Sequence, residues 1–102
     1  MERASQYIIT EREKELLTDY AEILKALSHP IRLCIVKKLC LYGECNVTCI
    51  QNSLNMPQST VSQHLSKLKA LGIVDGKRQG TEIIYNVVNP KAKLIVDTLM
   101  NK

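Results

Sequence analysis

The feature that most constrains this sequence is a pair of short helical patterns with almost no chain between them. The patterns are Val47–Leu54 and Gln58–Ala70, and only Asn55-Met56-Pro57 separates them. Proline is favoured in the first turn of a helix, and a glycine such as Gly72 is favoured just past its end. The sequence therefore predicts two short helices joined by a tight turn.

Two β-prone runs follow the second helix. They are Ile73–Lys77 and Glu82–Val88, and a glycine in the intervening Arg78-Gln79-Gly80-Thr81 fits a hairpin turn. Asn89-Pro90 ends the hairpin. Two short helices followed by a basic hairpin are the layout of a winged helix-turn-helix, whose second helix enters the major groove of DNA.

Three further helices are predicted around this unit, at Glu11–Leu27, Pro30–Leu41 and Pro90–Met100. The first and the last carry apolar residues at helical spacing: Leu17, Tyr20, Ala21, Leu24 and Leu27 in the first, and Ala92, Ile95, Val96 and Leu99 in the last. The predicted fold is mostly α with a small β-hairpin (α+β), with five helices and the hairpin before the last. Residues 1–102 are predicted to form a single domain.

Composition narrows the function classes. The 102 residues are 45% hydrophobic, which supports one core, although so small a domain is marginal and pairing would help it. The chain has four Tyr but no Trp or Phe, which argues against a single-strand binder that stacks bases on aromatic rings. The net charge is +4, and the positive charge gathers in residues 58–80, which contain four bases and one acid.

The sequence also predicts a cytoplasmic protein. No apolar run approaches the roughly 20 residues that a membrane span requires, and Tyr7-Ile8-Ile9 is too short for the core of a signal peptide. The four cysteines are therefore expected to be reduced rather than paired in disulfides.

The second helix of the pair is the candidate DNA-reading helix. At 100° per residue, Val61, Leu65 and Leu68 share one face. The opposite face is polar and carries Ser59, Gln63, Ser66 and Lys67, with Thr60 at its edge. A solvated polar face usually carries paired Glu and Lys, whereas this helix has no acid, as an anionic partner requires. Gln can pair with adenine through two hydrogen bonds, and Ser or Thr can serve bases or phosphate.

The hairpin adds a second candidate contact. Lys77, Arg78, Gln79 and Thr81 are placed at its tip, where they are expected to grip phosphate or the minor groove. The alternative interpretation is an ordinary charged turn.

Two long segments resemble the ArsR/SmtB family of bacterial repressors. They are "LKALSHPIRLCIVKKL" and "PQSTVSQHLSKLKALGIVDGKRQGTEIIYNV", and the resemblance runs from about Leu24 to Val88. Four short segments are most similar to PagR-like members of the family: "NVTCI", "PQSTVSQHL", "RQGTEIIY" and "NPK". The resemblance implies a homodimer built from the first and last helices, bound to a double-stranded operator with an imperfect palindrome and released by an inducer. It places Gln58, Ser59, Ser62 and Gln63 at the bases. His64 is typical of the family, but it lies near the apolar edge of the helix and is interpreted as a structural residue.

The metal sites of that family are not matched. Its "ELCVCD"-type motif aligns with Glu44–Cys49 and puts its two cysteine positions at Asn46 and Thr48. The second family site needs Asp and His on the last helix, which has Asp97 but no His. We therefore expect no metal site and no cofactor.

The cysteines leave three alternatives open: inert thiols, a redox or thiol-modification sensor, and a metal or arsenite sensor. Cys34, Cys45 and Cys49 are the candidate sensor residues, with Cys45 expected in a loop. In the Pro30–Leu41 helix, Cys34 points away from an apolar face that consists of Leu33, Ile35, Val36, Leu39 and Cys40. Lys37 and Lys38 follow one turn later and favour its thiolate, so Cys34 is predicted to react fastest.

Two other function classes compete with a DNA-binding regulator. A winged helix can dock another protein instead of DNA, although the acid-free face of residues 58–70 argues against that role. An enzyme has little support, because the only histidines, His29 and His64, lie in no recognisable catalytic constellation.

Overall fold

The computed structural model describes residues 7–100, and the ends of the predicted 1–102 domain, residues 1–6 and 101–102, lie outside them. The described part contains five helices and three strands: α2 (Glu11–Leu27), α3 (Pro30–Tyr42), β1 (Cys45–Asn46), α4 (Val47–Leu54), α5 (Gln58–Ala70), β2 (Val74–Gln79), β3 (Glu82–Val87) and α6 (Pro90–Met100). The predicted winged helix-turn-helix order is confirmed, and four of the five helices have the predicted bounds.

Local capping interactions explain why the ends of the helices could be predicted from the sequence. The Thr10 hydroxyl accepts a hydrogen bond from the Glu13 amide and caps α2, and His29 Nδ1 accepts from the Ile31 amide and caps α3. Asn55 ends α4 in the left-handed conformation, with φ of 52°. Each of these signals lies within a few residues of the boundary that it sets.

The sheet contains a third strand that was not predicted. The antiparallel strands have the order β1-β3-β2, so β3 lies between the hairpin partner β2 and the short strand β1. Cys45 was expected in a loop, and that prediction is wrong, because Cys45 pairs with Tyr85 and Asn46 pairs with Ile84. The partners are about forty residues away, and the local sequence therefore gives no sign of this strand.

The turn of the hairpin is tighter than predicted, and the outer ends of its strands, at Val74 and Val87, each lie one residue inside the predicted runs. Arg78 and Gln79 belong to β2 rather than to the turn, and Gln79 pairs directly with Glu82. Gly80 has a φ of 64°, which a two-residue hairpin turn requires and which glycine adopts at little cost.

The core lies where α3, α4 and α5 meet the base of the hairpin formed by β2 and β3 (the wing). Its fully buried side chains come from α3, α4, α5 and α6 and from the residue before β2: Ile35, Val36, Ile50, Val61, Leu65, Leu68, Ile73, Ala92 and Val96. The predicted apolar faces of α3 and α5 are both confirmed. This core holds α5 rigidly and leaves its opposite side free.

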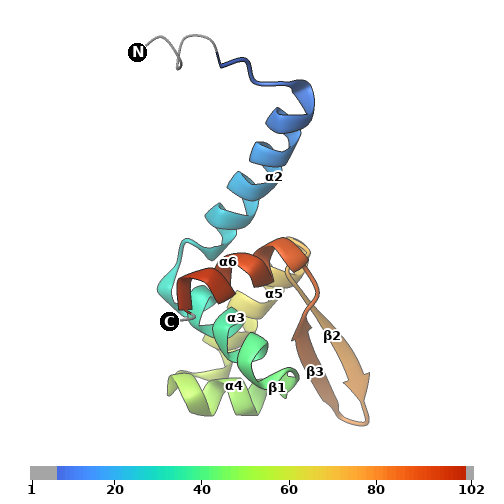
Figure 1. Cartoon of the computed structure of the whole chain (residues 1–102). Helices are drawn as coiled ribbons and strands as arrows, with labels where there is room; N and C mark the ends of the chain where they lie inside the picture. Colours follow the sequence, from blue (N-terminus) through green and yellow to red (C-terminus); the bar gives the residue numbers. More distant parts are fainter. Residues whose placement is uncertain (1–6, 101–102) are drawn as a thin grey trace.

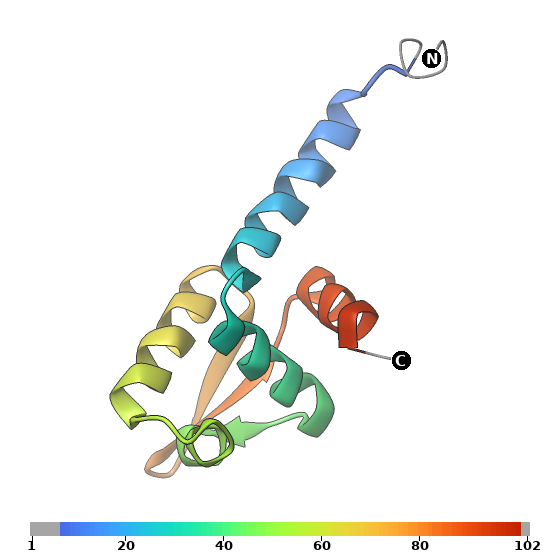
Figure 2. The ribbon, with the colours of Figure 1, turned by 90° about the vertical axis from the view of Figure 1, so that its left-hand side faces the viewer.

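Helix α2 projects from this body (Figures 1 and 2), and only Ile23, Ala26 and Leu27 near its C-terminal end are buried. The Cα radius of gyration is 16.5 Å, whereas a compact chain of this length has about 13 Å. The expected apolar stripe of this helix is therefore mostly uncovered, at Leu17 and Leu24. No helix between residues 7 and 100 is long and apolar enough to cross a membrane.

Candidate nucleic-acid interface

Helix α5 presents a polar face to solvent. Val61, Leu65 and Leu68 are fully buried, which fixes the rotation of the helix. The predicted contact residues then divide by exposure: Gln58, Ser59, Gln63, Ser66 and Lys67 are exposed, and Thr60 and Ser62 are half-buried. No side chain caps the N-terminus of α5, and Lys67 and Lys69 lie in its last turn. The outward face therefore offers uncharged hydrogen-bonding groups and cations, and no carboxylate of its own.

The wing carries the other predicted residues. Lys77, Arg78 and Gln79 lie on the outer half of β2 and Thr81 lies in the turn, all of them exposed. Figure 1 shows the hairpin extending beyond the body on the side of α4 and β1. The two cations are thus held on a paired strand rather than on a mobile loop.

A cavity of about 220 Å³ joins the helix-turn-helix to the wing. Its lining includes Thr48 at the start of α4, Gln58 at the start of α5 and Thr81 at the wing turn. Asn46 Nδ2 donates a hydrogen bond of 2.8 Å to Oε1 of Glu82 across the same place. The structure therefore brings the first residue of the reading helix close to the wing, which the sequence did not reveal.

Arg32 is a cation that sequence reasoning missed. It comes from α3 and lines a cavity of about 430 Å³ together with Ser62, Gln63, His64, Ser66 and Lys67 of α5. Its Nε donates to His64 Nδ1 at 3.4 Å, and its Nη1 donates to the Ala26 carbonyl at 3.4 Å. Arg32 precedes His64 by 32 residues, so only the packing of α3 against α5 places it beside the reading face.

His64 occupies the edge between the polar and apolar faces of α5. Its ring centroid lies 4.6 Å from that of His29, the capping residue of α3. Partial burial, then His29, then the Arg32 guanidinium lower the pKa of His64. The neutral ring accepts the Arg32 hydrogen bond, which agrees with the structural role predicted for this residue.

The four cysteines lie in different environments. Cys34 is exposed, as predicted, whereas Cys40 is half-buried, and burial followed by the nearby Asp97 raises the pKa of the Cys40 thiol. Cys45 is buried and Cys49 is exposed, yet their Sγ atoms lie 3.4 Å apart. Lys38, one of the two cations predicted to act on Cys34, instead holds its ammonium 4.6 Å from the centre of the Tyr42 ring.

Metal ligands do not gather in the described part of the chain. Residues 7–100 contain no group of three or more His, Cys, Asp or Glu side chains that could hold one ion. Cys45 and Cys49 come together, but no third ligand of these types joins them.

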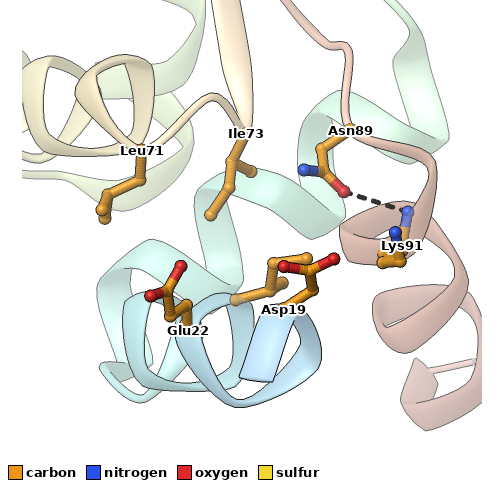
Figure 3. A pocket seen from close by; sticks show the side chains of 7 residues that line it. Asp19, Glu22, Leu71, Ile73, Asn89 and Lys91 are labelled. Carbon is orange, nitrogen blue, oxygen red and sulfur yellow. Dashed lines mark hydrogen bonds between the residues drawn. The ribbon is translucent and has the colours of Figure 1, made fainter. Parts of the chain in front are cut away.

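A separate cavity of about 230 Å³ lies between α2, α6 and the start of the wing (Figure 3). Asp19 and Glu22 of α2 contribute carboxylates to it, and Asn89 accepts hydrogen bonds from the Lys91 and Ala92 amides and so caps α6. Two carboxylates beside one lysine do not suit a phosphate backbone. This cavity is therefore set apart from the DNA candidate surface.

Comparisons with known proteins identify relatives along most of the chain. Residues 29–75 match the family described as "Bacterial regulatory protein, arsR family". The transcriptional repressor PagR of Bacillus anthracis is 47% identical over 83 residues, which cover 81% of this chain and 83% of PagR. Its crystal structure aligns with a TM-score of 0.77 and 46% identity, over 85% of this chain and 99% of that one.

Two further relatives extend the similarity. The repressor SmtB of Mycobacterium tuberculosis is 38% identical over 87 residues, which cover 84% of this chain and 64% of SmtB. The solution structure of a homodimeric winged helix-turn-helix DNA-binding domain, Mb0332 of Mycobacterium bovis, aligns with a TM-score of 0.73 and 30% identity, over 88% of this chain and 82% of that one. These relatives confirm the predicted resemblance to the ArsR/SmtB family and the similarity of the short segments to PagR.

Proposed function

This chain belongs to the ArsR family of bacterial regulatory proteins and is a DNA-binding transcriptional repressor rather than an enzyme, and we propose that it acts in the cytoplasm as a homodimer on a palindromic operator. In this proposal one winged helix-turn-helix domain supplies the DNA contacts, and its terminal helices supply the dimer interface.

The exposed face of α5 carries the proposal. It presents Gln58, Ser59 and Gln63 toward solvent, with Thr60 and Ser62 at its edges and Lys67 further along. A helix in the major groove needs short hydrogen-bonding side chains to distinguish base edges. Gln63 has both a donor and an acceptor and is the residue to which we assign base discrimination.

The wing supplies affinity rather than discrimination. Lys77 and Arg78 are exposed cations on β2, and Gln79 and Thr81 add hydrogen-bonding groups beside them. Contacts of this kind to phosphate fix the position of a protein on the duplex and carry little sequence information. The wing therefore holds the duplex while α5 reads it.

Dimerisation follows from the apolar side chains that one protomer leaves uncovered. Leu17 and Leu24 on α2, and Leu94 and Leu99 on α6, each expose about half of their surface. Burial of a fully exposed leucine side chain contributes about 1.5–3 kcal/mol, and burial of the exposed half of each of these contributes roughly half of that, so a second copy of these helices is favourable. The Mb0332 relative is described as homodimeric, which supports the same arrangement here.

The decisive test is a footprint of the duplex that the protein selects from a random-sequence library. We expect two related half-sites whose centres lie one helical turn apart, about 34 Å, because a two-fold dimer presents two α5 helices. Analytical ultracentrifugation of the same sample is expected to give a dimer at micromolar concentration. A single unpaired half-site, or a monomer, would refute the homodimer.

A salt titration separates this function from a protein-docking winged helix. Phosphate contacts release counterions, so the logarithm of the affinity falls linearly and steeply with the logarithm of the salt concentration.

Zinc at one equivalent is expected to leave the complex with DNA intact, because Asn46 and Thr48 occupy the positions of the family's cysteine ligands. Tight binding of one zinc per protomer with loss of DNA would overturn that expectation.

A further inference from the structure

Cys45 and Cys49 are the two thiols that the fold brings into contact. Their Sγ atoms lie 3.4 Å apart, although one residue is on β1 and the other is on α4. Cys45 is 6% exposed, whereas Cys49 is open to solvent. One sulfur is thus within reach of a dissolved reagent, and the other lies directly behind it.

The capping geometry of α4 creates this contact. Asn46 is the N-cap, so Cys45 directly precedes the cap and Cys49 is the third residue of the helix. The chain that enters the helix lies against its first turn, and here it places the Cys45 sulfur beside that of Cys49. Pairing of Cys45 with Tyr85 of β3 holds the deeper sulfur in place.

We propose that Cys45 and Cys49 form a reversible intramolecular disulfide when a hydroperoxide reaches Cys49, and that this bond weakens operator binding. The second half of this statement rests on the proposed repressor function. The formation of the bond does not.

The chemistry balances with the peroxide as the only oxidant. The Cys49 sulfur, after giving up its proton, attacks the peroxide; an S–O bond forms, the O–O bond breaks, and the departing oxygen takes the proton to leave as water or an alcohol. The Cys45 sulfur then attacks Cys49 Sγ, the S–O bond breaks, and the hydroxide leaves as water with the Cys45 proton. The two thiols lose two electrons and two protons, and the peroxide gains them.

The environments of the two sulfurs fit these roles. Burial, and then the contact with Cys49, raise the pKa of the Cys45 thiol, while the nearby Lys38 lowers it in part. Cys45 therefore stays protonated while Cys49 meets the oxidant. A disulfide has an S–S length of about 2.05 Å, so the two sulfurs must approach each other by more than an ångström.

That approach acts on the junction between the wing and the two helices α4 and α5. Asn46 lies between the two cysteines, where its Oδ1 accepts from the Cys49 amide at 2.8 Å and its Nδ2 donates to Glu82 of β3. The cavity beside this junction is lined by both Gln58 and Thr81. Movement of the first turn of α4 therefore shifts the start of α5 relative to the wing, and we expect an affinity loss of about tenfold.

The test uses a Cys34→Ser/Cys40→Ala variant, which keeps only the pair. The probe is the palindromic duplex that the reduced protein selects from a random-sequence library. After treatment with hydrogen peroxide and blocking with iodoacetamide, peptide mapping is expected to find the Cys45–Cys49 disulfide within one chain. Operator affinity is expected to fall about tenfold and to return with dithiothreitol.

The matched control adds Cys49→Ser to that variant. Cys49 is exposed, so this substitution spares the core, and peroxide is expected to leave the operator affinity of this protein unchanged. Absence of the disulfide, or a disulfide between two chains, would overturn the inference. A Cys45–Cys49 disulfide with undiminished affinity would overturn its coupling to DNA.

Failure of the proposed function would look different. If the reduced protein retained no duplex from the library, the repressor function and the regulatory half of the inference would both fall. Peptide mapping would still decide whether the disulfide forms, because that measurement needs no DNA.

Discussion

Helices α5 and α2 each leave one face uncovered, but the two faces have opposite chemistry. The face of α5 is polar, with Gln63 and Lys67 exposed, while its apolar side is fully buried in its own chain. The face of α2 is apolar, with Leu17 54% and Leu24 50% exposed. The difference indicates the partner of each helix: a polar, acid-free face suits a nucleic acid, and an apolar face suits another protein surface.

The α2 face gives the largest expected effect. A Leu17→Glu substitution would place a charge in the proposed dimer interface, so we expect a monomer at micromolar concentration. Loss of the second reading helix removes the gain from two linked contacts, which amounts to about 100-fold or more in operator affinity. Sedimentation and DNA titration measure the two effects.

The neighbouring Thr18→Glu variant is the control for that experiment. Thr18 is also exposed on α2 and acquires the same charge, but it lies outside the apolar stripe. It is expected to remain a dimer with nearly unchanged affinity. If Leu17→Glu also stayed dimeric, the apolar face of α2 would not be the interface.

The α5 face gives the next largest effect. Gln63→Ala is expected to cost about 1–3 kcal/mol on the selected operator and little on random DNA, because it removes a base contact. Lys77→Ala or Arg78→Ala is expected to weaken binding to both DNAs alike and to reduce the salt slope by about one unit each. Equal losses on both DNAs for Gln63→Ala would refute the assignment of the reading face.

The two cysteines of α3, one exposed and one half-buried, are expected to react with alkylating reagents at different rates. Cys34 is on the exposed side with Lys37 one turn away, and Cys40 is half-buried with a raised pKa. Timed iodoacetamide labelling with mass spectrometry is expected to modify Cys34 first, about tenfold faster than Cys40 at neutral pH. Faster labelling of Cys49 would show that exposure at the start of α4 outweighs the lysine beside Cys34.

The pattern of agreement with the sequence has a physical cause. Helix ends were predictable because Pro30, Pro57 and the Asn55 turn act within a few residues. Strand β1 was not predictable, because its hydrogen bonds are to Tyr85 and Ile84, far along the chain. The rotation of α5 could be predicted from the spacing of its apolar residues.

In the candidate site, too, features set by nearby residues could be predicted from the sequence, and features set by distant residues could not. Exposure of the reading face and of the wing could be predicted from helical periodicity and from the charge of the hairpin. Three features required the tertiary structure: Arg32 beside α5, the cavity between Gln58 and Thr81, and the contact between Cys45 and Cys49. The first two depend on packing between elements that are far apart in the sequence. The third depends on the pairing of β1 with β3, which holds Cys45 at the start of α4. The sequence pattern of any one element does not contain that information.

The smallest expected effect concerns His64, at the edge between the two faces of α5. Its pKa is lowered from the ordinary value of 6.5, so the unfolded chain takes up a proton more readily than the folded one as the pH falls through that value. The stability contributed by the neutral ring is therefore present above about pH 6.5 and is lost below it. Protonation removes the acceptor for Arg32 Nε and places a second charge beside its guanidinium.

Urea unfolding of the wild-type protein is expected to show a lower midpoint at pH about 5.5 than at about 7.5, because the contribution of the neutral His64 ring is lost on acidification. The His64→Gln variant, which keeps a hydrogen-bond acceptor but does not titrate, is expected to lose part of that difference. An identical pH dependence in the two proteins would contradict the prediction and assign the acid sensitivity to groups outside this cluster.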